Sequence, residues 1–346
     1  QKGIVMIFCS KPQKFTWRNA ITLLLLLTAG SILILLLIPS GSWFGSETDW
    51  YSQHVTIADY MRKNFYATGS LFPDFTGLGG GTNFFSLSYY GFMRPDVLIS
   101  YLFPHVEMEW FIQGYAIFEI LLGGGLLYYW LHRKGFSDFT SFACGFFYLT
   151  ANCFFQAHRQ IMFVNYMPFL CLTFLGIDRY FEQKKSGLLI GGTFLMIMTS
   201  FYFSIGGILA LGLYGIYRYA RTKERAEETV TVKGFMGDGI QFAGRILTAI
   251  MLAGVLLVPT AMALLGRSRS RGEKVNFLQL LIPQINLKKF LYGAYGPGLS
   301  CLVLIILLTG LFYKKAYEKI LSLGCLVVLT VPFFSYLLNG ALYIRP

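Results

Sequence analysis

The 346 residues would suffice for two soluble domains, but 55% of them are hydrophobic, only 13% are charged and the mean hydropathy is +0.55. This composition excludes an ordinary soluble protein and predicts a multi-pass membrane protein, because about 20 apolar residues span a bilayer as a helix. The net charge of +12 would suggest nucleic acid in a soluble chain. Here cytoplasmic Lys and Arg explain it, and the chain contains no nucleic-acid motif.

The first apolar run, Ala20–Ile38, follows a segment with four basic residues and no acidic one. The run is too long for a typical signal-peptide core, and no small-x-small cleavage site follows it. We interpret it as a retained first span with its N-terminus in the cytoplasm.

Eight further apolar runs make a total of about nine expected transmembrane helices. They cover residues 110–131, 137–155, 161–178, 187–201, 204–219, 246–265, 298–313 and 320–338. In this layout the inside segments, residues 220–245 among them, carry 18 of the 29 Lys and Arg residues. The bias has the sign that the positive-inside rule requires. We therefore expect a single transmembrane domain over residues 1–346 of an all-α protein in the cell membrane.

Residues 40–109 form an unusually long first exoplasmic loop in this layout. Within it, Asp49–Phe65 has the pattern of a helix, with Ser46 and Thr48 as candidate N-caps. Pro95–Phe103 is apolar but too short to span. Both pieces are typical of helices that lie at the membrane surface.

Asp49 is the strongest candidate for chemistry in this loop. At helical spacing it shares a face with Gln53 and Thr56, which suits a hydroxyl-bearing substrate near the membrane surface. The alternative is that Asp49 only caps the helix.

Polar groups within or beside spans give further candidates. Glu119 lies inside a span, where a carboxylate is costly, so it is functional or else a protonated group bonded to a neighbouring helix. His158, Arg159 and Asn165 lie at the outer mouth between two spans. A cation there meets an anionic ligand or extends to lipid headgroups.

The glycine-rich run Gly77–Asn83 lacks the Lys-Ser/Thr ending of a phosphate loop and lies outside the cell, so it predicts flexible backbone near a ligand. Pro168 is expected to kink the span over 161–178. No metal-ligand spacing stands in the sequence, which leaves a need for a divalent cation open.

The basic exoplasmic loop, residues 266–297, breaks the charge rule. It carries Arg267, Arg269, Arg271, Lys274, Lys288 and Lys289 against one acid, Glu273. Attraction to anionic headgroups is the simplest explanation. Its position outside instead favours a lipid-linked phosphate as ligand, because guanidinium groups bind phosphate in a bidentate manner.

Six motifs stand out along the chain: GSETDWYSQH at Gly45–His54, FYATG at Phe65–Gly69, GLGGGTN at Gly77–Asn83, SYYG at Ser88–Gly91, HRQIMFVNYMPF at His158–Phe169 and NGALY at Asn339–Tyr343. Together they resemble the motifs of the bacterial YfhO family. Members of that family are usually longer, with more helices. The resemblance therefore implies that the chain corresponds to an N-terminal portion and that acceptor-binding parts lie outside it.

The resemblance implies a GT-C-like membrane glycosyltransferase that takes a sugar from a polyprenyl-phosphate donor outside the membrane. The acceptor would be lipoteichoic acid or another envelope polymer, and a separate membrane glycosyltransferase would synthesise the donor. The resemblance carries the catalytic role to Asp49. The expected donor-phosphate residues are Arg267, Arg269, Arg271, Lys274, His158 and Arg159, and the expected substrate-binding residues are Gln53, His54, Asn83 and Asn165.

Two other classes of function compete with this prediction. A transporter or lipid flippase of envelope precursors would have short loops and polar residues in several spans. Among these features, only the polar residue Glu119 within a span supports that class. A non-catalytic assembly subunit is the third. Membrane lipids are expected partners in every case.

Overall fold

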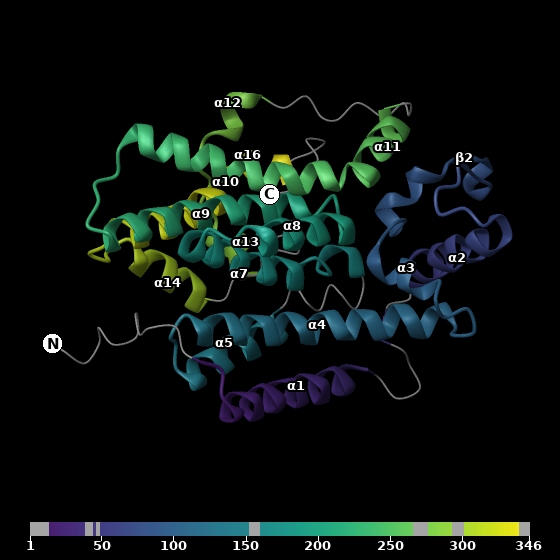
Figure 1. The fold of residues 1–346 in the computed structure, drawn as a ribbon, viewed down its shortest axis with the longest axis horizontal. Coiled ribbons are helices and arrows are strands. Elements are labelled where there is room, and N and C mark those ends of the chain that lie inside the picture. The colour runs from purple at the N-terminus through teal and green to yellow at the C-terminus, as the bar shows by residue number, and fades with distance from the viewer. Residues whose placement is uncertain are drawn as a thin grey trace. The chain divides into compact units, whose positions relative to one another are not determined.

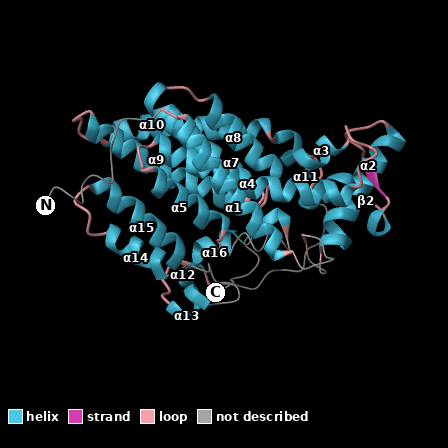
Figure 2. Ribbon diagram, turned by 90° about the horizontal axis from the view of Figure 1, so that it is seen from below, coloured by secondary structure: helices cyan, strands magenta, loops and turns pink. Residues whose placement is uncertain are grey.

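The computed structural model describes residues 14–38, 44–45, 49–151, 160–265, 276–292 and 301–338. About three quarters of them are helical (Figure 1). The strands in this part of the chain are β1 (Phe75–Thr76) and β2 (Thr82–Asn83), a short antiparallel pair in which Phe75 lies opposite Asn83 (Figure 2). The predicted all-α class is confirmed.

The chain forms two compact units. Unit 1 comprises residues 1–176, 186–204 and 246–265, and unit 2 comprises residues 177–185, 205–245 and 266–346. The elements that lie within unit 1 are α1 (Trp17–Leu37), η2 (Trp50–Val55), α2 (Thr56–Thr68), β1, η3 (Leu78–Gly80), β2, η4 (Phe84–Tyr90), α3 (Pro95–Ser100), α4 (Met108–Arg133), α5 (Asp138–Leu149), η5 (Ile161–Phe163), α8 (Gly187–Thr199) and α11 (Gly254–Leu265).

Unit 2 contains the C-terminal helices. They are α12 (Phe277–Leu280), α13 (Leu287–Tyr292), α14 (Cys301–Gly310), α15 (Ala316–Thr330) and α16 (Pro332–Leu338). Three helices contribute residues to both units, namely α7 (Met167–Gln183), α9 (Ser204–Arg225) and α10 (Val232–Leu252).

Helices α1, α4 and α5 pack side by side in unit 1 (Figure 1). Glycine allows a close approach of these helices, because a Cβ at Gly145 would lie 2.7 Å from Leu26 and 3.2 Å from the carbonyl oxygen of Gly124. Small residues at such contacts are typical of membrane helices, which associate through close packing of their backbones.

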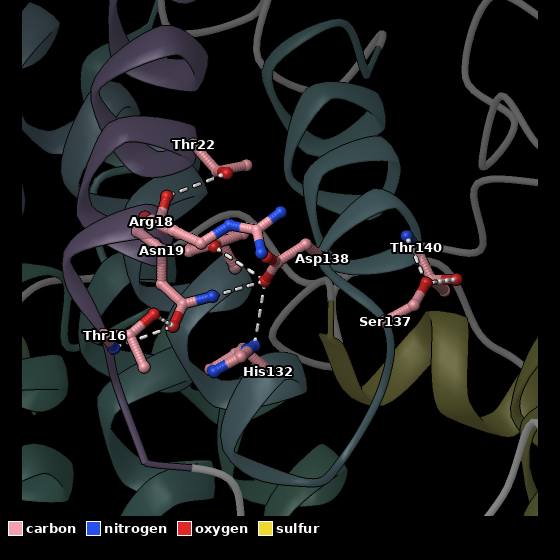
Figure 3. A network of polar contacts seen from close by, with 9 residues as sticks. Thr16, Arg18, Asn19, Thr22, His132, Ser137, Asp138 and Thr140 are labelled. Atoms are coloured by element: carbon pink, nitrogen blue, oxygen red, sulfur yellow. Dashed lines mark hydrogen bonds and ion pairs between the residues drawn. The ribbon is translucent and has the colours of Figure 1, made fainter.

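A polar network around Asp138 joins the same three helices (Figure 3). The Asp138 carboxylate, in the first turn of α5, accepts from Asn19 Nδ2 of α1 at 2.6 Å and lies 3.1 Å from His132 Nδ1 of α4. Tyr128 donates to the same oxygen at 3.2 Å. Asn19 is itself oriented because its amide oxygen accepts from Thr16 at 2.7 Å.

A second polar network stabilises unit 2. Arg218 of α9 is only 3% exposed, and its Nε lies 2.7 Å from Asp178 Oδ1 of α7. Arg218 Nη2 donates to Glu182 Oε1 at 2.9 Å, and the Tyr214 hydroxyl donates to Asp178 Oδ1 at 2.7 Å. The buried guanidinium is thus paired with one carboxylate through Nε and with another through Nη2, as a desolvated charge requires.

Three helical segments of the described chain are long and apolar enough to cross a membrane, namely Trp17–Leu37, Met108–Arg133 and Ile161–Gln183. Two bent pairs raise this number to five if each counts as one span: Val232–Leu252 with Gly254–Leu265, bent by 68°, and Ala316–Thr330 with Pro332–Leu338, bent by 71°. A multi-pass membrane protein is therefore supported, whereas the count of nine spans and the single domain stay predictions.

Several predicted boundaries differ for local reasons. The expected span over 320–338 breaks at Val331, whose extended conformation (φ −90°, ψ 113°) is what a residue before proline prefers. The span over 246–265 breaks at Ala253, beside Gly254 and ahead of Pro259, both of which weaken a helix. Pro168 does not kink a helix, because α7 begins at Met167 and leaves Pro168 in the first turn.

The helix predicted over Asp49–Phe65 exists as η2 followed by α2. It ends three residues later than predicted, where Gly69 takes a left-handed conformation (φ 69°) and its N–H bonds Phe65 O. The candidate caps Ser46 and Thr48 lie outside the described residues. Whether α2 and α3 lie at a membrane surface stays a prediction.

The orientation in the membrane gives the first testable prediction. We expect residues 40–109 and 266–297 to face outward and residues 220–245 to face the cytoplasm, because the charge count favours it. In a background without native cysteines, a membrane-impermeant thiol reagent applied to intact cells should label a cysteine at position 270 and not one at 229. The reverse pattern would overturn the orientation.

Candidate functional site

The site is built on η2, a π-helical turn that follows Asp49 directly. The carbonyl oxygen of Asp49 accepts from the backbone N–H of Gln53 at 2.9 Å and of His54 at 3.1 Å, and the second bond widens the turn. Trp50 anchors the turn, since its side chain is fully buried and packs edge-on against Phe44 with ring centroids 6.2 Å apart. Such π-helical turns occur frequently at functional sites.

The Asp49 carboxylate is held by two amides. Gln53 Nε2 donates to Oδ1 at 2.8 Å, and Gln160 Nε2 donates to Oδ2. Asp49 occupies the N-cap position of η2, but its side chain makes no capping hydrogen bond. Each carboxylate oxygen keeps a second lone pair, so the half-buried group remains able to accept a proton from a ligand.

His54 supports Asp49 from the interior. Its Nε2 lies 3.0 Å from Gln160 Oε1, the amide oxygen that remains once Gln160 Nε2 bonds Asp49. His54 must therefore carry its proton on Nε2, because only a donor satisfies that oxygen. Burial, and next the charge of Arg94, lower the pKa of His54 to about 4, so the imidazole is neutral at pH 7.

A buried ion pair lies close to His54. Arg94 and Asp96 are 1% and 0% exposed, and they form two bonds, from Nε at 2.6 Å and from Nη2 at 2.8 Å. Gly91 makes room for this arginine, because it has φ 104° and a Cβ there would lie 2.9 Å from the guanidinium carbon. Met93 also takes a positive φ of 64°, so the turn that aims Arg94 is strained.

Glu119 of α4 belongs to the same cluster. Its side chain is 3% exposed and interacts electrostatically with Asp96, Arg94 and Tyr115. A carboxylate inside a span is usually paired, and here Arg94 is the neighbouring cation. The sequence predicted Glu119 as a candidate but gave it no partner.

An open cavity of about 390 Å³ adjoins α2 in unit 1. Its wall includes Thr56, Asp59, Lys63, Glu107 and Glu109. The Thr56 hydroxyl bonds the carbonyl oxygen of Tyr51, and the Tyr51 hydroxyl donates to Glu109. Burial and Glu109 raise the pKa of Tyr51 to about 12, so this phenol stays protonated.

The remaining predicted residues lie in several places. Asn83 is exposed and accepts from the N–H of Phe85 at 2.9 Å, so it caps η4. Asn165 is 2% exposed, and its amide atoms have no hydrogen-bond partner in the described part of the chain. Six predicted phosphate-binding residues lie outside the described residues: His158, Arg159, Arg267, Arg269, Arg271 and Lys274.

The structure thus brings Asp49, Gln53 and His54 together as the sequence motif suggests. It adds three residues that sequence reasoning did not select, namely Gln160, Arg94 and Asp96. Arg94 and Asp96 flank Pro95 within an apolar stretch. Two opposite charges in such a stretch are the sequence signal that could have indicated a buried ion pair. Among the described residues, no group of three or more His, Cys, Asp or Glu side chains is arranged to hold a metal ion.

The neutrality of His54 gives a prediction for acid pH. The unfolded imidazole has a pKa near 6.5 and the folded one about 4, so only the opened segment binds a proton between these values. The stability contributed by neutral His54 is complete above pH 6.5 and falls as the pH drops toward 4. At pH 5 the loss is about 2 kcal/mol.

Hydrogen exchange of residues 50–68, corrected for intrinsic rates, should show this loss of protection between pH 6.5 and 5. In His54→Gln, which cannot titrate, most of the pH dependence should vanish. Equal pH dependence in both proteins would contradict the role of His54.

A comparison with protein-family models matches residues 20–342 to "Bacterial membrane protein YfhO". Neither the comparison with curated proteins nor that with solved structures gives a match. The matched range covers nearly the whole chain, including every element of the site. The chain therefore belongs to the YfhO family of bacterial membrane proteins.

Proposed function

We propose that this protein is a membrane glycosyltransferase that uses a polyprenyl-phosphate sugar as donor and an envelope polymer, such as lipoteichoic acid, as acceptor. Family membership supports a membrane protein of this kind. The single observation that carries the proposal is the Asp49 carboxylate, held by Gln53 and Gln160 at the start of the first loop helix.

In the proposed reaction Asp49 acts as general base. It takes the proton of an acceptor hydroxyl while that oxygen attacks the anomeric carbon of the donor sugar. The bond between the anomeric carbon and the phosphate oxygen breaks, and polyprenyl phosphate leaves with the electron pair. One displacement of this kind inverts the anomeric configuration.

The surroundings of Asp49 suit a base. Two N–H donors fix the orientation of the Asp49 carboxylate, and charge-assisted bonds of this type are stronger than neutral ones. His54 stays neutral and fully buried behind Gln160, so it positions the amide without competing for the acceptor proton. Polyprenyl phosphate is a good leaving group and needs cations more than an acid.

Mass spectrometry of envelope polymers tests the proposed function. Cells without the gene should lose one sugar modification, and the wild-type gene should restore it. A gene encoding Asp49→Asn should not. Identical polymer profiles with and without the gene would contradict the proposal.

The basic exoplasmic loop gives a separate prediction. We propose that Arg267, Arg269, Arg271 and Lys274 bind the donor phosphate, and one charge-assisted bond contributes about 1.5–3 kcal/mol. Replacing Arg269 and Arg271 by glutamine should therefore raise the donor concentration needed for half-maximal transfer by about tenfold or more.

The matched control replaces Lys288 and Lys289 by glutamine, which removes the same charge from the same loop. Both variants should reach wild-type levels in the membrane. Equal dependence of the two double variants on donor concentration would contradict the phosphate proposal. It would show that the loop only attracts anionic lipid headgroups.

A further inference from the structure

A slot is formed within unit 2, whereas the Asp49 site belongs to unit 1. The slot has a volume of about 180 Å³ and an almost wholly apolar wall formed mainly by the middle of α9 and the N-terminal half of α10. The lining residues of α9 are within 212–219 and those of α10 within 235–242, and Phe181 of α7 also lines the slot. Eight residues of helix make the slot about 10 Å long.

Glycines create this space. A Cβ built at Gly212 of α9 or at Gly239 of α10 would have no neighbouring atom within 4 Å. Gly215 of α9, one turn after Gly212, instead packs against the ring of Phe242, and a Cβ at Gly215 would lie 2.6 Å from that ring. Helices α9 and α10 are thus in contact at Gly215. The missing side chains of Gly212 and Gly239 leave an open apolar channel beside that contact.

A polar group without a partner lies at one end of the slot. The Tyr219 side chain is 6% exposed, and its hydroxyl has no hydrogen-bond partner among the described residues. The hydroxyl lies beside the first turn of α10, 3.5 Å from the position of a Cβ at Gly234. A buried hydroxyl costs free energy unless a ligand or water satisfies it.

The neighbouring helix end favours an anion. The first turn of α10 contains Lys233 and no acidic residue, and Thr231 Oγ1 accepts from only one of its N–H groups, that of Gly234. Helix N-termini attract anions through their unpaired N–H groups and the helix dipole. Asp238 also lines the slot, and Lys223 Nζ lies 4.0 Å from its carboxylate.

An apolar channel with an anion-binding end matches one chemistry. We propose that the α9–α10 slot binds an acyl chain of a membrane phospholipid, whose phosphate lies beside the Tyr219 hydroxyl and the first turn of α10. The apolar wall accounts for the acyl chain, and the Tyr219 hydroxyl together with the first turn of α10 accounts for the phosphate. The site is independent of the proposed glycosyl transfer.

Photolabelling tests the proposal. The full protein is reconstituted in phosphatidylcholine vesicles that contain phosphatidylglycerol with a diazirine at the end of one acyl chain. After illumination, mass spectrometry of peptides should find label concentrated at residues 212–219 and 235–242. Label spread evenly over the apolar helices would overturn the proposal.

Variants that fill the slot sharpen the test. Gly239→Leu or Gly212→Leu should lower this labelling about tenfold or more, because several methylene groups lose their place. Each substitution enters open space, so both proteins should fold. Gly237→Leu is the matched control, since Gly237 lies on α10, also has nothing within 4 Å and does not line the slot. Its labelling should equal that of the wild type.

The headgroup is tested separately. Tyr219→Phe keeps the ring and should lower labelling about fivefold through loss of one hydrogen bond. A diacylglycerol with the same diazirine should label the wild-type slot less than the phospholipid does. Equal labelling by diacylglycerol, or stronger labelling by a polyprenyl phosphate with the same diazirine, would overturn the phospholipid assignment.

Discussion

Replacing Asp49 by asparagine should lower the rate of sugar transfer by about 10²-fold or more, because general-base catalysis supplies about 10²–10⁴-fold. The fold should survive. Asparagine keeps an oxygen for one of the two glutamine amides, and Gln53 can turn its own amide to accept from the new NH₂ group. The measurement is turnover of the purified variant in vesicles, with secondary structure checked by circular dichroism.

Glu47→Gln is the control for this prediction. Glu47 stands two residues earlier in the same acidic segment. Its loss should have a milder effect, because the family resemblance carries the catalytic role to Asp49 alone. A folded Asp49→Asn protein with near-normal turnover would remove Asp49 from the chemistry.

Replacing Arg94 by methionine should destabilise unit 1 by about 3–5 kcal/mol, the cost of breaking a buried ion pair by removing one partner. The variant leaves Asp96 without the two bonds it receives and leaves Glu119 without its neighbouring cation. Thermal unfolding of the purified protein should show the loss. Arg94→Lys should restore only part of it, since an ammonium cannot make the bidentate contact.

Lys63→Met supplies the matched control. Lys63 also pairs with an aspartate, Asp59 at 2.6 Å, but its side chain is 77% exposed. An exposed pair contributes about 0–1 kcal/mol, so this variant should unfold almost like the wild type. Equal losses from Lys63→Met and Arg94→Met would show that burial of the Arg94 pair is not what makes it important.

Local sequence signals predicted the fold class and the start of the site. The helical spacing of apolar residues after Asp49 indicated a helix, and the spacing of four residues placed Gln53 beside Asp49. Local signals also explain the errors. The spans were predicted from hydropathy, which contains no information on backbone conformation. It therefore missed the extended conformation that Val331 prefers before Pro332 and that ends α15 at Thr330.

Contacts between distant segments were not readable in the same way. Gln160 reaches Asp49 from 111 positions away, and no pattern within either segment encodes that pairing. His54 illustrates a related difficulty, because the motif makes it a substrate-binding candidate while the structure buries it completely behind Gln160. The burial of His54 follows from the π-helical turn, whose wider spacing rotates His54 inward in a way that ordinary helical spacing does not predict.

Sugar transfer by the purified protein tests the central claim most directly. The wild-type protein in vesicles would receive a panel of polyprenyl-phosphate hexoses and an extracted envelope polymer, and released polyprenyl phosphate would be quantified. We predict release from one donor that requires the polymer, equals the sugar gained by the polymer and falls about 10²-fold in Asp49→Asn. Release that is absent for every donor, or unchanged in Asp49→Asn, would contradict the proposed function and its catalytic residue.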